Sequence, residues 1–163
     1  MEYRPRIPHA SDGSHTRHYL IPGKIFVAAQ PFAISTIVGS GVVLCLWDSG
    51  HRIGGANHFM LPEGPDDGQN STRYGSIANP ALLQRLLELG ADPKALEAKI
   101  FGGSLPKITF AHRESHLDDR NVRIATHFLN EKGIRLVQCD VGKTRGRKVV
   151  FQTDDGYSWA EPL

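Results

Sequence analysis

From Lys24 onward the apolar residues come in short runs bounded by glycine and proline, a pattern typical of β-strands. Six runs predict strands, at residues 25–29, 42–47, 56–61, 96–101, 134–139 and 148–152. The run VVLCLW at 42–47 is apolar at every position. It therefore predicts a central strand that is buried on both faces.

Two longer stretches predict helices. In the first, Asn79 can cap the helix, Pro80 suits its first turn, and Gly90 can end it. Four leucines share one face of this helix: Leu82, Leu83, Leu86 and Leu87. The second helix starts at a cap formed by Asp118 or Asp119 and ends near Gly133. Strands with two inserted helices predict an α/β or α+β domain, with helices packed on a largely buried sheet.

Two segments lack such periodicity. Residues 1–20 are polar and contain prolines, so we expect a flexible or loosely docked N-terminal arm, followed by a single domain over 21–163. The composition of 63–74 predicts a loop. Three histidines of the arm match no compact metal-ligand spacing, and we expect neither a metal nor a cofactor. They are His9, His15 and His18.

Composition narrows the class of protein. A chain of 163 residues with 40% hydrophobic and 22% charged residues is ordinary for a globular domain. The formal net charge of +2 gives no electrostatic argument for binding nucleic acid or membranes. No apolar run approaches the ~20 residues of a membrane-spanning helix, so we expect no membrane insertion. The densest basic run, 143–148, predicts a solvated turn, with a phosphate-binding patch as the alternative.

The cysteines indicate a compartment. Cys45 and Cys139 both lie in apolar, strand-like runs and form neither a CxxC pair nor a disulfide framework. We therefore expect two buried, reduced thiols in a cytoplasmic protein.

The stretch IVGSGVVLCLWDSGHRIGGANHFMLP, residues 37–62, carries the candidate chemistry. Small residues at 39–41 allow backbone N–H groups to converge on a bound oxygen, as an oxyanion hole requires. The alternative is a simple tight turn that enters a strand. His58 follows in an apolar strand, where it is either a structural residue or a base for a nearby thiol or hydroxyl.

Six segments resemble the CheD family, the chemoreceptor glutamine deamidases of bacterial chemotaxis. They are STIVGSGVVLCLWD (35–48), GGANHFMLP (54–62), RYGSIANPALLQRLLELGA (73–91), LEAKIFGGS (96–104), RNVRIATHFLNEKGI (120–134) and GKTRGRKVVF (142–151). They follow the family's order and cover most of the chain from about residue 24 to 151.

The resemblance implies a fold and a reaction. The fold is a three-layer arrangement of two packed β-sheets with helices, similar to cytotoxic necrotizing factor-type deamidases. In the reaction, a cysteine thiolate attacks the carboxamide carbon of a receptor glutamine, ammonia leaves, and water hydrolyses the thioester. A histidine activates the thiol, and a hydroxyl shortly before the cysteine supports the site.

The family's catalytic residues carry over only in part. Where the family has Gly-Ser-Cys, this chain has Gly-Ser-Gly, so Gly41 occupies the position of the nucleophile. His58 matches the family's histidine. Ser35 matches the supporting hydroxyl, and Thr36 is the alternative if the register shifts by one. The turn, the base and the hydroxyl are therefore expected, without the sulfur.

Other nucleophiles are poor substitutes for the missing thiol. Cys45 lies roughly 13 Å further along the same strand, at ~3.3 Å per residue. Ser40 should point to the other face from position 41, and its hydroxyl is far less acidic than a thiol. We expect the chain to be very slow or inactive, because losing a nucleophile commonly costs several orders of magnitude in rate.

Three functions remain open. The first is a deamidase scaffold whose thiol has been lost or replaced. The second is a non-catalytic protein that docks on the cytoplasmic helices of methyl-accepting chemotaxis receptors or on a CheC-type phosphatase, which by resemblance binds this family's substrate-facing surface. The third is different chemistry that uses His58 with water or a metal.

Overall fold

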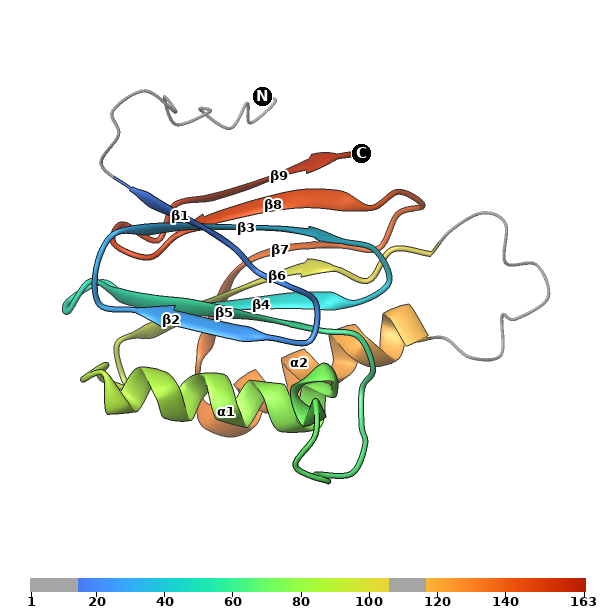
Figure 1. The fold of residues 1–163 in the computed structure, drawn as a ribbon, viewed down its shortest axis with the longest axis horizontal. Helices are drawn as coiled ribbons and strands as arrows, with labels where there is room; N and C mark the ends of the chain where they lie inside the picture. Colours follow the sequence, from blue (N-terminus) through green and yellow to red (C-terminus); the bar gives the residue numbers. More distant parts are fainter. Residues whose placement is uncertain (1–14, 106–116) are drawn as a thin grey trace.

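The computed structural model describes residues 15–105 and 117–163. Within these ranges, two β-sheets and two helices form three layers (Figure 1). The five-stranded sheet lies between the four-stranded sheet and the helices. The predicted fold class of two packed sheets with helices is confirmed.

The five-stranded sheet has the order β2-β5-β4-β6-β7. Its strands are β2 (Ile25–Ala28), β4 (Val42–Asp48), β5 (Ile53–Phe59), β6 (Leu96–Gly102) and β7 (Arg135–Val141). The all-apolar run VVLCLW forms the central strand β4, as predicted, and every residue of β4 except Trp47 is buried. Neighbouring strands pair antiparallel except β6 and β7, which are parallel.

The four-stranded sheet has the order β1-β3-β8-β9. Its strands are β1 (Thr16–Tyr19), β3 (Phe32–Val38), β8 (Arg147–Gln152) and β9 (Ser158–Pro162). Strand β3 alternates between buried and more exposed positions, so one of its faces meets the other sheet. This alternation determines which side chains reach the space between the sheets.

The two helices cover the outer face of the five-stranded sheet (Figure 1). Helix α1 (Gly75–Glu88) packs on β2 and β5, after a short 3₁₀ turn η1 (Ser71–Arg73). Helix α2 (Leu117–Lys132) packs on β4, β6 and β7 and forms the crossover between the parallel strands β6 and β7. Neither described helix is long and apolar enough to cross a bilayer.

Strand β4 contributes to two separate apolar cores through its alternating side chains. Val42, Leu44 and Leu46 pack against the helices. Val43 and Cys45 face the opposite way, into the core between the sheets. A side chain at position 41 continues the second series, since it is two residues before Val43.

The expected N-terminal arm, residues 1–20, contains a strand that the sequence pattern did not predict. Residues 1–14 lie outside the described ranges, but Thr16–Tyr19 form strand β1, parallel to β3. Leu20 is completely buried in the core between the sheets. The polar sequence of residues 16–19 concealed this strand, because β1 is an edge strand with mostly exposed side chains.

Helix α1 begins earlier than predicted, at Gly75 instead of after Asn79. Asn79 is buried inside the helix, where its Oδ1 accepts a hydrogen bond from Asn57 Nδ2 at 2.8 Å. Gly75 allows close packing, since a Cβ there would lie 2.8 Å from Phe59 Cε2. Tertiary contacts therefore extend the helix through residues whose intrinsic preference is weak.

Two further expectations differ from the structure. Cys139 is exposed on the edge strand β7, whereas Cys45 is buried as expected. Within the basic run 143–148, Lys143, Thr144 and Arg145 are exposed as a turn requires, but Arg147 is buried. A long amphipathic side chain can be buried where backbone carbonyls satisfy its guanidinium, and here they do.

Candidate active site at the entrance of the central strand

The turn at residues 39–41 is held by its carbonyl groups. Gly103 N donates to Gly41 O at 2.8 Å, and Ser104 N donates to Gly39 O at 3.0 Å. Asn121 Nδ2 donates to Ser40 O at 3.1 Å. Gly41 is buried, whereas the two preceding residues are exposed. The fold thus fixes three successive carbonyls of this turn, at the edge of the space between the sheets.

His58 faces the same space from strand β5. Its partner on the neighbouring strand β4 is Val43, and the residue is 4% exposed. Its Nδ1 lies 3.0 Å from Thr36 Oγ1 of β3. The imidazole therefore connects the two sheets at one end of their common core.

The hydrogen bonds of Thr36 determine the tautomer of His58. The Thr36 hydroxyl donates its single proton to Leu20 O at 2.8 Å. Since that proton is used, Thr36 Oγ1 can only accept from the imidazole, and both bonds form only when Nδ1 carries the hydrogen. The remaining nitrogen, Nε2, then has an unprotonated lone pair.

Nε2 is the nitrogen that approaches residue 41. A Cβ added to Gly41 would lie 3.4 Å from His58 Nε2 and 3.6 Å from its Cδ2. The same Cβ would lie 2.7 Å from Phe59 O, so a side chain at 41 requires a small shift of the β4–β5 pair. The backbone of Gly41 does not have the positive φ that favours glycine. Position 41 is therefore adjacent to the base, as an attacking group would need to be.

Burial keeps the ring neutral. Removal from water lowers the pKa of His58 to about 4, because the protein interior stabilises the imidazolium less than water does. At neutral pH the ring can accept a proton at Nε2. The arrangement is thus a positioned, neutral base with no ionisable group at residue 41.

Of the two hydroxyl candidates, the structure brings Thr36 to the ring and not Ser35. Thr36 is buried on the face of β3 that meets the other sheet. Ser35 is the adjacent residue of the strand, so its side chain points to the opposite face. A shift of one residue in a strand reverses the face, and the sequence alone left this register open.

The other candidate nucleophiles lie elsewhere or are unreactive. Cys45 is buried, and desolvation raises the pKa of its thiol to about 12, so it remains protonated. Ser40 is exposed at the tip of the turn, and its carbonyl accepts a hydrogen bond from Asn121. No group of three or more metal-binding side chains exists within 15–105 and 117–163. Of the arm histidines, His15 bonds Asp154 and His18 stacks on Phe26, while His9 lies outside the described residues.

Asn121 is a residue that sequence reasoning missed. Its Nδ2 donates to Ser40 O and also to Met60 O at 3.0 Å, which links the turn before Gly41 to the residue that follows β5. Its own Oδ1 is buried without a partner in the described structure. The available signal was a polar residue on the apolar face of α2, four residues before Ala125.

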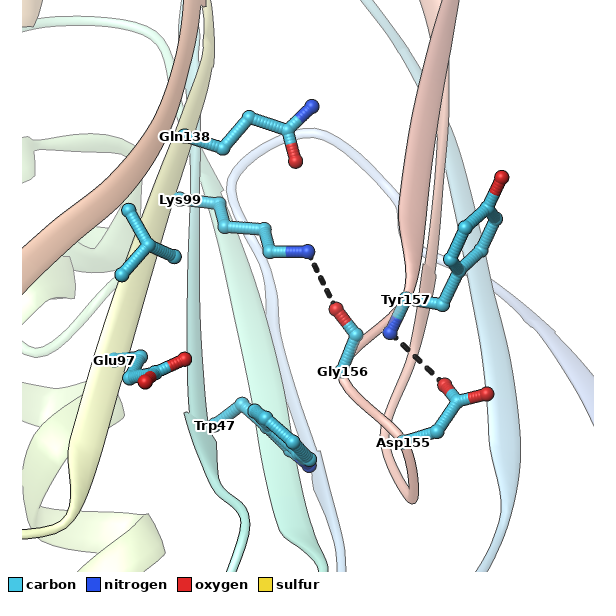
Figure 2. A pocket seen from close by; sticks show the side chains of 8 residues that line it. Trp47, Glu97, Lys99, Gln138, Asp155, Gly156 and Tyr157 are labelled. Atoms are coloured by element: carbon cyan, nitrogen blue, oxygen red, sulfur yellow. Dashed lines mark hydrogen bonds between the residues drawn. The ribbon is translucent and has the colours of Figure 1, made fainter. Parts of the chain in front are cut away.

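A cavity of about 400 Å³ lies at the other end of β4 (Figure 2). Trp47 forms part of its wall, about 20 Å from residue 41 at the rise of a strand. Lys99 extends across it and donates to Gly156 O at 2.5 Å and to Ser158 Oγ at 2.9 Å, which leaves its ammonium engaged with the fold. This cavity is separate from the histidine site.

Comparison with known proteins decides the family. Residues 60–161 match the family described as CheD chemotactic sensory transduction. This chain belongs to the CheD family. Because the matched stretch begins after His58, Gly41 and His58 lie outside it.

Curated relatives of CheD type cover nearly the whole chain. "Probable chemoreceptor glutamine deamidase CheD 1" of Anaeromyxobacter dehalogenans is 42% identical over 93% of this chain and 87% of its own length. Relatives named "Probable chemoreceptor glutamine deamidase CheD" are 37% identical in Sulfurimonas denitrificans and 40% identical in Trichlorobacter lovleyi. The first of these two alignments covers 87% of this chain and 91% of the relative, and the second covers 89% and 90%.

A solved structure of a Neisseria meningitidis protein from the DUF152 family aligns with 74% of this CheD-family chain and 53% of its own chain. The identity is 11% and the TM-score is 0.43, a similarity too low to support an argument about fold or function.

Proposed function

We propose that this protein binds the glutamine-bearing cytoplasmic helices of chemoreceptors and deamidates them very slowly or not at all. The main support is the distance of 3.4 Å between His58 Nε2 and a Cβ built on Gly41. A base is in place, but the group that it would deprotonate is missing. Without the covalent step, hydrolysis would depend on water alone, at a cost of several orders of magnitude in rate.

Each part of the site would have a role in the reaction of a protein with a thiol at position 41. His58 Nε2 would take the proton of a thiol at position 41, and the sulfur would then bond to the glutamine carboxamide carbon. The imidazolium would return that proton to the departing ammonia, and water would release the glutamate and regenerate the thiol. Thr36 would hold the ring in the Nδ1–H tautomer. Backbone N–H groups of the turn 39–41 would stabilise the oxyanion, a role for which the fixed turn is suited.

The decisive experiment compares residue 41 variants on one substrate. A purified cytoplasmic fragment of a chemoreceptor from the same organism is incubated with the protein as given, G41C or G41A. Intact-mass spectrometry then detects the mass gain of each glutamine converted to glutamate. We expect conversion with G41C only, because G41A adds the same Cβ without the sulfur.

Two outcomes would contradict the proposal. Conversion by the Gly41 protein as fast as by G41C would mean that the thiol position is irrelevant. Conversion that persists in the double variant G41C/H58Q would show that His58 is not the base. Circular dichroism of each variant separates lost chemistry from lost folding.

The second candidate function is binding without catalysis, on receptors or on a CheC-type phosphatase. Two features of the site favour this function. His58 is only 4% exposed, and a neutral base without a nucleophile cannot carry out the covalent reaction. A pull-down with purified receptor fragment and with a purified CheC-type protein tests both partners. Binding to neither would remove this function.

A further inference from the structure

A second cavity, of about 360 Å³, lies beside the turn that holds Gly41. It is lined by Asp140, Lys143, Thr144, Arg145, Arg147, Ala160 and Pro162. The lining thus contains three cationic side chains and one carboxylate. The lining therefore has an excess of positive charge, although the whole chain has a formal net charge of only +2.

The cavity is tied to the candidate active site through one backbone segment. Leu105 N donates to Lys143 O at 2.8 Å, and Gly142 N donates to Gly102 O at 3.0 Å. Residues 103 and 104 of the same segment hold the carbonyls of Gly41 and Gly39. A Cβ at Gly146 would lie 3.9 Å from Gly39 Cα. The basic turn and the turn before β4 are therefore direct neighbours.

Arg147 makes this arrangement rigid. Its side chain is 3% exposed, with Nη1 donating to Gly102 O at 3.0 Å and Nη2 to Gly142 O at 2.8 Å. Its Nε lies 3.3 Å from Asp140 Oδ1. Since Arg147 and Asp140 are engaged with the fold, Lys143 and Arg145 are the charges that remain exposed at the cavity.

Lys143 lies in a turn whose backbone is held by its neighbours, since its carbonyl accepts from Leu105 N and the Gly142 carbonyl accepts from Arg147 Nη2. Its φ is +64°, in the left-handed region that non-glycine residues rarely adopt. Its side chain is 74% exposed and lies 3.4 Å from Asp140 Oδ1, a surface ion pair of little energetic value. Backbone conformations of this kind cluster at binding sites, and here one holds the exposed cation of Lys143 at the rim of the cavity.

We propose that Lys143 and Arg145 bind an acidic side chain of the same receptor helix that presents its glutamine to His58. This inference rests on the proposed receptor binding and adds a specificity rule to it. The preferred receptor segments carry an aspartate or glutamate near the target glutamine. A carboxylate fits the chemistry, because the exposed ammonium and guanidinium both donate charge-assisted hydrogen bonds.

The test uses variants that leave the fold intact. K143G removes the charge and supplies the residue that suits a positive φ, and R145Q neutralises an exposed side chain. The matched control is K94Q. Lys94 is exposed and precedes β6 by two residues, at the end of that strand opposite Gly102. Circular dichroism and urea unfolding verify each fold.

Binding is measured by fluorescence anisotropy on two receptor fragments at low salt. One is the native sequence, and in the other the acidic residues within one helical turn of the target glutamine are changed to glutamine. We expect the parent to bind the native fragment about 3- to 10-fold more tightly, as two exposed charge contacts allow. The K143G/R145Q variant should bind both fragments equally, and K94Q should behave like the parent.

The possible results distinguish a failure of this inference from a failure of the proposed receptor binding. If the parent binds receptor but K143G/R145Q retains the preference for the acidic fragment, this inference is wrong and the proposed function stands. The inference is also wrong if K94Q weakens binding as much, since the effect is then nonspecific charge. If the parent binds neither fragment, the proposed function fails, and this inference fails with it.

Discussion

Thr36 Oγ1 lies 3.0 Å from His58 Nδ1 and donates a hydrogen bond to Leu20 O at 2.8 Å. This chain of two hydrogen bonds links three strands or strand ends from the two sheets. It leaves Nε2 of His58 as the free acceptor beside Gly41. The geometry of the candidate site therefore depends on one hydroxyl that the sheet register buries.

Replacing this hydroxyl should destabilise the protein. T36V preserves the shape of the side chain but leaves the imidazole N–H and the Leu20 carbonyl without a partner, at about 1–3 kcal/mol for each buried group. Urea unfolding measures the loss in the free energy of unfolding. The control S35A changes the neighbouring residue on the opposite face and should cost about 0.5 kcal/mol or less. Equal losses for the two variants would contradict the role of Thr36.

The stability of the protein should fall as the pH decreases from about 6.5 to about 4. The pKa of His58 is about 4 in the folded protein and 6.5 when exposed, so the unfolded state binds more protons in this window. Stability therefore rises with pH there, by on the order of 3 kcal/mol across the window. Unfolding of H58Q should lack this component, and an unchanged pH profile in H58Q would refute it.

A methyl group at position 41 should be tolerated with a measurable penalty. The added Cβ in G41A would lie 2.7 Å from Phe59 O, so the β4–β5 pair must shift. Such overpacking typically costs about 1–3 kcal/mol. G41C should cost a similar amount. Denaturant midpoints test this expectation, and it fails if G41A is as stable as the parent.

The two natural cysteines should differ in reactivity. Cys139 is exposed and should be alkylated in the folded protein, although partial burial raises the pKa of its thiol and slows the reaction. Cys45, with a pKa of about 12 and no exposure, should react only after unfolding. Mass spectrometry after iodoacetamide treatment distinguishes one modification from two. Rapid labelling of Cys45 in the native state would contradict its burial.

Asn121 should matter more than an exposed asparagine on the same helix. N121A removes the donor shared by Ser40 O and Met60 O, and we expect a loss of about 2–3 kcal/mol in the free energy of unfolding. N130A on the exposed face of α2 should change it by about 0.5 kcal/mol or less. Thermal unfolding of both variants is the measurement. Similar values for the two would mean that the amide does not hold the turn.

Local sequence determined the parts of this protein that depend on patterning. The uniformly apolar run at 42–47 required a central strand, and the leucines of α1 required a helix face. The motifs around Gly41 and His58 indicated the family. Residues 16–19 could not be assigned in the same way, because an edge strand buries little and its polar side chains give no periodic signal.

Tertiary structure alone decided the contacts of the candidate site. Nothing in the sequence distinguishes Ser35 from Thr36, since the choice depends on which face of β3 meets the other sheet. Asn121 reaches the turn at Ser40 only because α2 packs on the central strand, 81 positions away in sequence. Long-range packing brings such groups within hydrogen-bonding distance, and short-range residue preferences carry no information about it.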